Sequence, residues 1–224
     1  IQSGSHRGYH SLAASGLEEP LTTHSDHYET NFAYGRAAYS KGAVFLDQLE
    51  YVIGTEAFEA GMKLFYDEWA FKHPRPMDLL RCMEKTSRME LDWYFDQWIG
   101  TTRRIDYGVS FKNYKGASVI ELDRKDKAIM PIDLKVVFED GGVSFYHIPL
   151  SLMRGEKTSD TKLTDDSIIT APDWQWTNPT YFLEVDDARK IKSVEIDPTH
   201  RLADYNTVNN VAPFAYEMNW MEPI

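Results

Sequence analysis

The chain has 224 residues, 42% of them hydrophobic and 26% charged, with a formal net charge of −11. This is the composition of a globular protein with one large domain or two small ones, and its acidic balance without a basic stripe argues against a nucleic-acid partner. No run of about 18 apolar residues is present, so we expect no membrane insertion. The single cysteine, Cys82, permits no internal disulfide, and it fits a cytoplasmic location as well as a periplasmic or secreted one.

The first half of the chain has the hydrophobic spacing of helices. Residues 1–33 are mixed and polar, which predicts a loop with one short helix. From residue 34 to residue 99 apolar side chains recur mostly every three or four positions, which predicts four short helices. Gly54 ends the first of these, the third begins near Met77, and Gly100 closes the fourth. Short helices with short links are typical of a helical bundle.

The second half changes to alternation with a period of two. Apolar residues alternate with polar ones from about Ile105, and Asp140-Gly141-Gly142 has the composition of a hairpin turn. Six or seven short strands over this length predict a small antiparallel β-sandwich. The expected fold class is therefore α+β in two domains. The helical domain covers residues 1–104, the sandwich 105–200 and a C-terminal tail 201–224.

Complete catalytic motifs are absent from the 224 residues. There is no His-Glu-x-x-His, no Gly-x-Ser-x-Gly and no phosphate-binding loop. The stretch His24-Ser25-Asp26-His27 has zinc-type ligands but is more typical of a polar loop. The stretch from Asp204 to Asn210 resembles the start of a calcium loop but lacks its glycine and its closing glutamate, which favours turn and capping roles.

The stretch AAYSKGAVFL, residues 37–46, is the most unusual part of the helical half. It reads as the start of a helix, yet it contains a tyrosine, a lysine and a glycine where apolar residues would be expected. Tyr39 has two interpretations: plain packing with its hydroxyl at the surface, or a phenol that donates a hydrogen bond to a developing oxyanion, aided by the helix N-terminus. Gly42 would allow close packing of the helix start against a neighbour. The pattern gives no physical role for Lys41.

Several ordered segments resemble the aminopeptidase N-like gluzincin metallopeptidases, the family that includes leukotriene A4 hydrolase. The segment that follows the zinc site in this family is similar to Tyr39-Ser40-Lys41-Gly42 with Ile53-Gly54-x-x-x-Phe58. The closing helices are similar to three further stretches, Phe65-Tyr66-Asp67-Glu68-Trp69, Met77-Asp78-Leu79 and Glu90-Leu91-Asp92-Trp93-Tyr94-Phe95-Asp96-Gln97-Trp98-Ile99. A β-sandwich commonly follows the catalytic domain of these enzymes. The resemblance covers roughly residues 18–200.

The resemblance implies roles for two tyrosines. In this family the tyrosine two residues before the Lys-Gly pair stabilises the tetrahedral intermediate of peptide hydrolysis, and that position is Tyr39. A second tyrosine, five residues earlier, often lines the same substrate cleft, and Tyr34 occupies that position. The family's zinc motif would lie before Ile1, so the resemblance implies no metal ligand in this chain, zinc in the full-length parent, and a peptide substrate for that parent.

The expected function is therefore that of the C-terminal part of a zinc aminopeptidase, which supplies the oxyanion-stabilising tyrosine but would not bind zinc or hydrolyse peptides alone. The alternative is a non-catalytic helical and β-sandwich interaction module. A carbohydrate-binding sandwich that uses Trp174 and Trp176 is a third interpretation by fold analogy. Because a missing upstream part would leave apolar surface uncovered, we also expect self-association through the truncated face.

Overall fold

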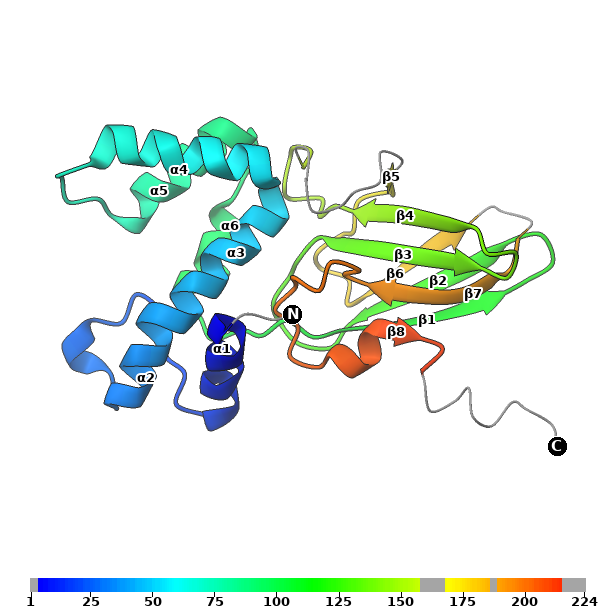
Figure 1. The fold of residues 1–224 in the computed structure, drawn as a ribbon, viewed down its shortest axis with the longest axis horizontal. Coiled ribbons are helices and arrows are strands. Elements are labelled where there is room, and N and C mark those ends of the chain that lie inside the picture. The colour runs from blue at the N-terminus through cyan, green and yellow to red at the C-terminus, as the bar shows by residue number, and fades with distance from the viewer. Residues whose placement is uncertain (1–3, 158–167, 186–188, 215–224) are drawn as a thin grey trace. The chain divides into compact units, whose positions relative to one another are not determined.

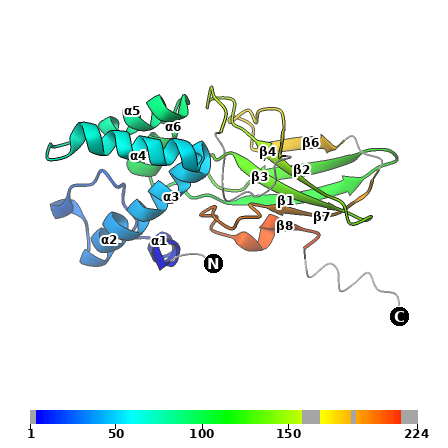
Figure 2. The same cartoon turned by 45° about the horizontal axis from the view of Figure 1, so that its top comes forward.

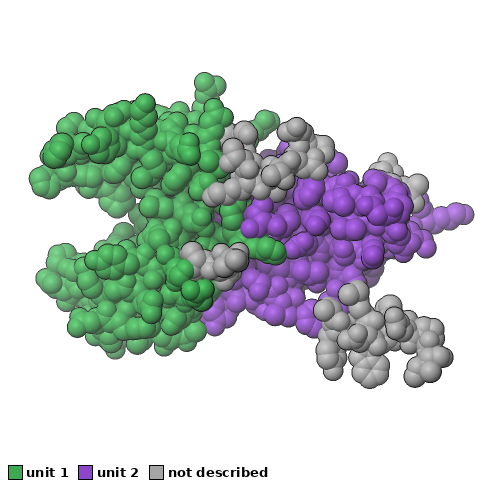
Figure 3. Space-filling model, viewed as in Figure 1, with its two compact units in different colours: residues 1–103, 152–164, 200–203 green, residues 104–151, 165–199, 204–224 purple. Residues whose placement is uncertain are grey.

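The computed structural model describes residues 4–157, 168–185 and 189–214. The chain divides into two compact units (Figure 3). Unit 1 contains residues 1–103, 152–164 and 200–203, and unit 2 contains residues 104–151, 165–199 and 204–224. Unit 1 is helical and unit 2 is formed by β-strands (Figure 1), so the predicted α+β class is confirmed.

The helical unit follows the predicted spacing of apolar residues. Its helices are α1 (Gly4–Ser15), α2 (Asn31–Gly35), α3 (Gly42–Ile53), α4 (Thr55–Trp69), α5 (Pro76–Ser87) and α6 (Asp92–Gly100). Gly54 separates α3 from α4 with a φ of 85°, a conformation that glycine adopts without steric cost. A proline in its first turn and a capping box between Arg75 and Asp78 fix the start of α5.

Helix α1 is longer than the short helix expected within residues 1–33. It has twelve residues, and Tyr9 and Leu12 on one of its faces are buried. Leu12 packs in a cluster with Ala33 and Ala37 of the next helical segments. The amphipathic face of α1 is hard to recognise in the sequence because glycine, serine and histidine occupy much of the helix.

The aromatic residues of α6 form the centre of the helical core. Tyr94, Phe95 and Trp98 are buried. Phe45 of α3 stacks on the Tyr94 ring, with 5.5 Å between centroids, and meets the Phe95 ring edge-on at 5.1 Å. The Tyr94 hydroxyl donates a hydrogen bond to the carbonyl of Phe45, so the one polar atom of this ring is satisfied inside the core.

Two later segments of the chain are part of the helical unit. The side chain of Gln48 donates to the carbonyl of Arg201 at 2.7 Å and accepts from the amide of Ala203 at 3.0 Å. The amide of Glu90 donates to the carbonyl of Met153 at 2.8 Å. The units are therefore discontinuous in sequence, and the simple domain ranges 1–104, 105–200 and 201–224 stay a prediction.

Unit 2 contains two sheets that lie one in front of the other (Figures 1 and 2). The first has the strand order β1-β2-β6 and the second β5-β4-β3-β7-β8. The bounds are β1 (Tyr107–Asn113), β2 (Ser118–Arg124), β3 (Ile132–Phe138), β4 (Val143–Ile148), β5 (Ile168–Thr170), β6 (Thr180–Val185), β7 (Ile191–Ile196) and β8 (Val211–Ala212). The pairing is antiparallel except between β4 and β5, which are parallel.

The sandwich core follows the alternation in the sequence. On β3, Ile132, Leu134 and Val136 are fully buried, and every second residue of a strand points to the same face. The β3–β4 hairpin turns at Gly141, whose φ is 86°, as its composition predicts. Short strands with one apolar face need such a second sheet to bury that face.

Candidate functional site

Tyr39 lies in the middle of a continuous helical segment. Helix α2 begins at Asn31, where the hydroxyl of Thr30 accepts from the amide of Ala33 at 3.0 Å. The π-helical segment η2 (Arg36–Lys41) follows directly and continues into α3. The interpretation of residues 37–46 as a helix start, with a helix N-terminus beside the tyrosine, is therefore wrong. The true N-terminus is at Asn31, more than a turn earlier, and the positive end of a helix dipole acts mainly within the first turn.

The π-helical hydrogen bonding of Arg36–Lys41 is itself an unusual feature of the helix. The amide of Gly42 donates to the carbonyl of Ala37, five residues earlier, instead of following only the α-helical pattern. Isolated π turns within α-helices are rare, and many of those that occur lie at functional sites. Lys41 and Gly42 keep right-handed helical dihedral angles, so the helix does not break at the turn.

Neighbouring side chains of this segment differ sharply in exposure. Ala37 and Lys41 are buried, whereas Tyr39 between them is 76% exposed. Tyr34 is 40% exposed, and its ring meets the ring of Tyr28 edge-on, with 5.6 Å between centroids. The segment therefore anchors itself through two side chains and presents the Tyr39 phenol outward.

The structure gives Lys41 a role that the sequence did not. Its Nζ atom lies 2.8 Å from Glu18 Oε1 and donates to the carbonyl of Thr101 at 3.0 Å. The side chains of Lys41 and Glu18 are 1% and 6% exposed. Burial lowers the pKa of Lys41, and the adjacent Glu18 opposes this shift. Thr101 caps the C-terminus of α6, where a positive charge is favourable.

The close approach expected at Gly42 occurs at another glycine. A Cβ atom at Gly42 would meet its nearest neighbour, the carbonyl of Ala37, at an ordinary 3.8 Å, so the close-packing role proposed for Gly42 is wrong. A Cβ atom at Gly8 of α1 would lie 2.3 Å from Ser40 Oγ and 2.9 Å from Arg36 Nη1. Gly8 therefore allows α1 to pack directly on the π-helical segment. The sequence contains no local signal for this, because the two residues are far apart in the chain.

The polar stretches singled out in the sequence have structural roles. The His24–His27 stretch contains the exposed turn Ser25–His27, capped by His24 Nδ1, which accepts from the amide of Asp26 at 3.3 Å. Asp204 is buried and accepts from the amides of Tyr107 at 3.0 Å and Asn206 at 2.8 Å. Burial raises the pKa of Asp204 to about 6, against the lowering effect of these donors.

One group of three possible metal ligands exists among the residues that the structure describes. Oxygen atoms of Glu84, Glu90 and Asp92 lie within 4.8 Å of one another. Zinc enzymes of the peptidase type use histidine together with a carboxylate, so three carboxylates do not fit such a site. Glu84 Oε1 also accepts from the amide of Leu91 at 3.0 Å, directly before the first residue of α6.

The two tryptophans considered for carbohydrate binding differ in exposure. Trp174 is 2% exposed, its ring lies against the rings of Tyr107 and Tyr181, and its indole nitrogen donates to the carbonyl of Asn178 at 2.9 Å. Trp176 is 49% exposed. A carbohydrate platform built from both rings is therefore excluded, because the first ring is part of the sandwich core. Within the described ranges, none of the helices has the length and apolar character needed to cross a membrane.

Comparisons with known proteins agree with the resemblance seen in the sequence. Residues 5–98 match the Peptidase family M1 domain. The chain is 38% identical over 63 residues to aminopeptidase N of Streptomyces lividans and 30% identical over 81 residues to human glutamyl aminopeptidase. These alignments cover 28% and 36% of this chain, but only 7% and 8% of the two relatives.

A solved structure shows that the fold is also shared. Aminopeptidase A of Legionella pneumophila, determined in complex with aspartic acid, aligns with 84% of this chain at a TM-score of 0.53. The alignment covers 19% of that enzyme at 10% sequence identity, so it is evidence for the fold alone. The matched residues 5–98 include the π-helical segment and Tyr39. The helices of this chain therefore resemble the Peptidase family M1 domain in sequence, and its fold is similar to that of a solved aminopeptidase.

Proposed function

We propose that this chain forms the part of a zinc aminopeptidase that supplies the Tyr39 phenol to the substrate. The observation that carries this proposal is the position of Tyr39, an exposed tyrosine on a π turn inside the region that matches the Peptidase family M1 domain. The zinc ligands would come from residues outside these 224, since the sequence holds no His-Glu-x-x-His motif. In such an enzyme zinc polarises the scissile carbonyl and activates water.

The chemical role of Tyr39 is hydrogen-bond donation. A neutral phenol donates one O–H bond to a carbonyl oxygen that gains negative charge, and it does so without changing its own charge. At 76% exposure the ring is open to a ligand, and the buried side chains of Ala37 and Lys41 on either side hold its backbone in place. This arrangement fixes the backbone from which the phenol projects, and donors of this kind accelerate a reaction when they are held in place.

Tyr34 is proposed as a second residue of the same cleft. Tyr34 lies in α2 and Tyr39 in η2, which continues directly from it. Tyr34 and Tyr39 are five apart and both exposed. The edge contact of Tyr34 with the Tyr28 ring restricts its side chain, which favours a positioning role for a peptide substrate.

The test uses a longer protein that joins this chain to an upstream sequence with the zinc motif. It should hydrolyse an aminoacyl amide in a chelator-sensitive manner, and Tyr39→Phe should lower kcat by about 10²–10³ with a much smaller change in KM. Tyr66→Phe is the matched control, because Tyr66 is also an exposed tyrosine of the helical unit, at 67%. Unchanged kcat in Tyr39→Phe would show that the assigned role is wrong.

The same experiment separates the enzyme from the alternative. If the longer protein neither binds zinc nor hydrolyses aminoacyl amides, the chain is better described as part of a non-catalytic interaction module. Zinc content of the purified longer protein provides this distinction independently of activity.

Self-association is proposed for the chain by itself. Several large apolar side chains of the helical unit are exposed, among them Tyr66, Phe71 and Met77 at 67%, 104% and 45%. Such surface is a common site of protein contact. Sedimentation velocity at several concentrations should show reversible association, and a strict monomer at every concentration would contradict the proposal.

A further inference from the structure

The ammonium group of Lys41 contacts two segments that are distant from it in the chain. Its Nζ atom lies 2.8 Å from Glu18 Oε1, in the loop after α1, and donates at 3.0 Å to the carbonyl of Thr101, directly after α6. All three residues belong to the helical unit. Because ion pairs and hydrogen bonds to charged groups have defined geometry, these contacts tie residue 41 to two fixed points.

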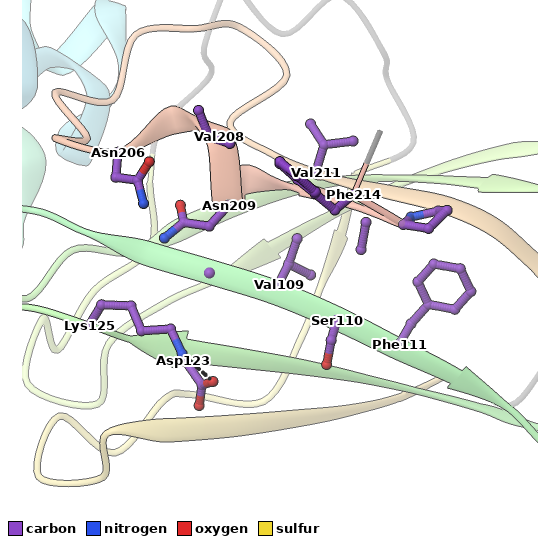
Figure 4. Close-up of a pocket in the computed structure, with 13 residues that line it drawn as sticks. Val109, Ser110, Phe111, Asp123, Lys125, Asn206, Val208, Asn209, Val211 and Phe214 are labelled. Atoms are coloured by element: carbon purple, nitrogen blue, oxygen red, sulfur yellow. Dashed lines mark hydrogen bonds and ion pairs between the residues drawn. The ribbon is translucent and has the colours of Figure 1, made fainter. Parts of the chain in front are cut away.

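This ion pair differs from those at the protein surface. In the sandwich unit, Lys125 and Asp123 also lie 2.8 Å apart, at the wall of a pocket of about 540 Å³ (Figure 4), but their side chains are 49% and 35% exposed. The side chains of Lys41 and Glu18 are 1% and 6% exposed. The cost of removing two charges from water often offsets their attraction, so a buried pair is weak evidence for added stability and can instead serve to fix one arrangement of the chain.

The arrangement beside this pair is the π turn that contains Tyr39. The amide of Gly42, the residue after Lys41, donates to the carbonyls of both Ala37 and Tyr39. Conversion of this turn to a regular α-helix would rotate the residues before Lys41 about the helix axis, relative to those after it, by up to about 100°, the angle of one residue. The direction of the Tyr39 side chain therefore depends on the π turn.

A second buried contact restrains the same turn. Ser40 is 8% exposed and packs against Gly8 of α1, where an added Cβ atom would lie 2.3 Å from Ser40 Oγ. Two buried residues, Ser40 and Lys41, thus follow Tyr39 directly, whereas Tyr39 itself is 76% exposed. The backbone that carries the exposed phenol is held from the buried side of the helix.

We propose that Lys41 and Glu18 are positioning residues for the Tyr39 phenol, and that their ion pair keeps the π turn in the arrangement that directs this phenol to the substrate. This inference rests on the proposed role of Tyr39 in peptide hydrolysis. Both residues are buried and act through the backbone of Tyr39 rather than on the substrate.

The first test is a double-mutant cycle on kcat in the longer protein that joins this chain to the zinc motif. Lys41→Met and Glu18→Gln should each lower kcat, expressed per bound zinc, by about 10–10²-fold with a small change in KM. In the Tyr39→Phe background, the same two changes should alter kcat by less than about twofold, because the hydroxyl group that they position is absent.

The matched control is Lys85→Met, which breaks the exposed pair with Glu68 and should leave kcat unchanged. Equal losses of kcat with and without the Tyr39 hydroxyl group would overturn the positioning role, because they would indicate general destabilisation. Unchanged kcat in Lys41→Met and Glu18→Gln, beside a lowered kcat in Tyr39→Phe, would overturn it while leaving the proposed function intact. Unchanged kcat in Tyr39→Phe alone would instead contradict the proposed function.

A second measurement does not depend on catalysis and uses the 224-residue chain with the milder change Glu18→Gln. The amide of Gly42, whose hydrogen bonds define the π turn, should exchange with solvent at least about tenfold faster than in the unaltered chain. The amide of Leu80 in α5 should keep its rate. Equal acceleration at both amides would assign the ion pair to overall stability alone, and no acceleration at Gly42 would show that the pair does not fix the π turn; either result would overturn the inference.

Discussion

Replacing Lys41 by methionine removes a buried charge while keeping most of the side-chain volume. The variant loses the ion pair with Glu18 at 2.8 Å and the hydrogen bond to the carbonyl of Thr101 at 3.0 Å. Glu18, at 6% exposure, would keep a carboxylate in the protein interior without the adjacent ammonium group. Loss of one member of a buried ion pair typically costs about 3–5 kcal/mol, and we expect the Lys41→Met variant to lose stability in this range.

A double-mutant cycle separates the pair from its surroundings. Glu18→Gln removes the second charge, so the double variant should be less destabilised than the sum of the two single variants by about 2–3 kcal/mol. The assay is urea denaturation followed by the helical circular dichroism signal, which reports on the unit that contains both residues.

The matched control is an exposed pair in the same unit. Lys85 Nζ and Glu68 Oε1 are 3.3 Å apart, with side chains 60% and 41% exposed. Lys85→Met should cost no more than about 1 kcal/mol, since solvent screens such pairs. If the Lys41 and Glu18 effects add within about 0.5 kcal/mol, or if both lysine variants are equally stable, the reasoning from burial is refuted.

Two further predictions concern packing and pH. Gly8→Ala should destabilise the helical unit by about 1–3 kcal/mol, because its Cβ would clash with Ser40. The control Gly35→Ala, with open space around its Cβ, should be neutral or stabilising by up to about 1 kcal/mol. Thermal melts of the two variants check this prediction, and equal melting temperatures would contradict it. Asp204 has a pKa raised to about 6, so its contribution to stability is full below the unfolded pKa of about 4 and is lost as the pH rises through 6, by up to about 3 kcal/mol. The stability difference between wild type and Asp204→Asn should change over this pH window, and a constant difference would show that the carboxyl group does not titrate there.

The helices and strands could be predicted because their signals are local. The spacing of apolar residues, the glycines at 54 and 141 and the proline at the start of α5 each act within a few residues of the chain. The same signals misplaced one boundary. Residues 37–46 were interpreted as a helix start, yet the helix begins at Asn31. The helix continues through these residues as a π turn, without a break.

The sequence by itself determined the α+β class, the order of the elements and the resemblance that singles out Tyr39. Only the tertiary structure decided that Lys41 pairs with Glu18, that Gly8 rather than Gly42 allows close packing, and that Trp174 is buried while Tyr39 is exposed. The physical reason is that hydrophobic periodicity depends only on residues that are close together in the sequence. The partner of a buried charge and the space beside a glycine depend instead on segments that meet only when the chain packs.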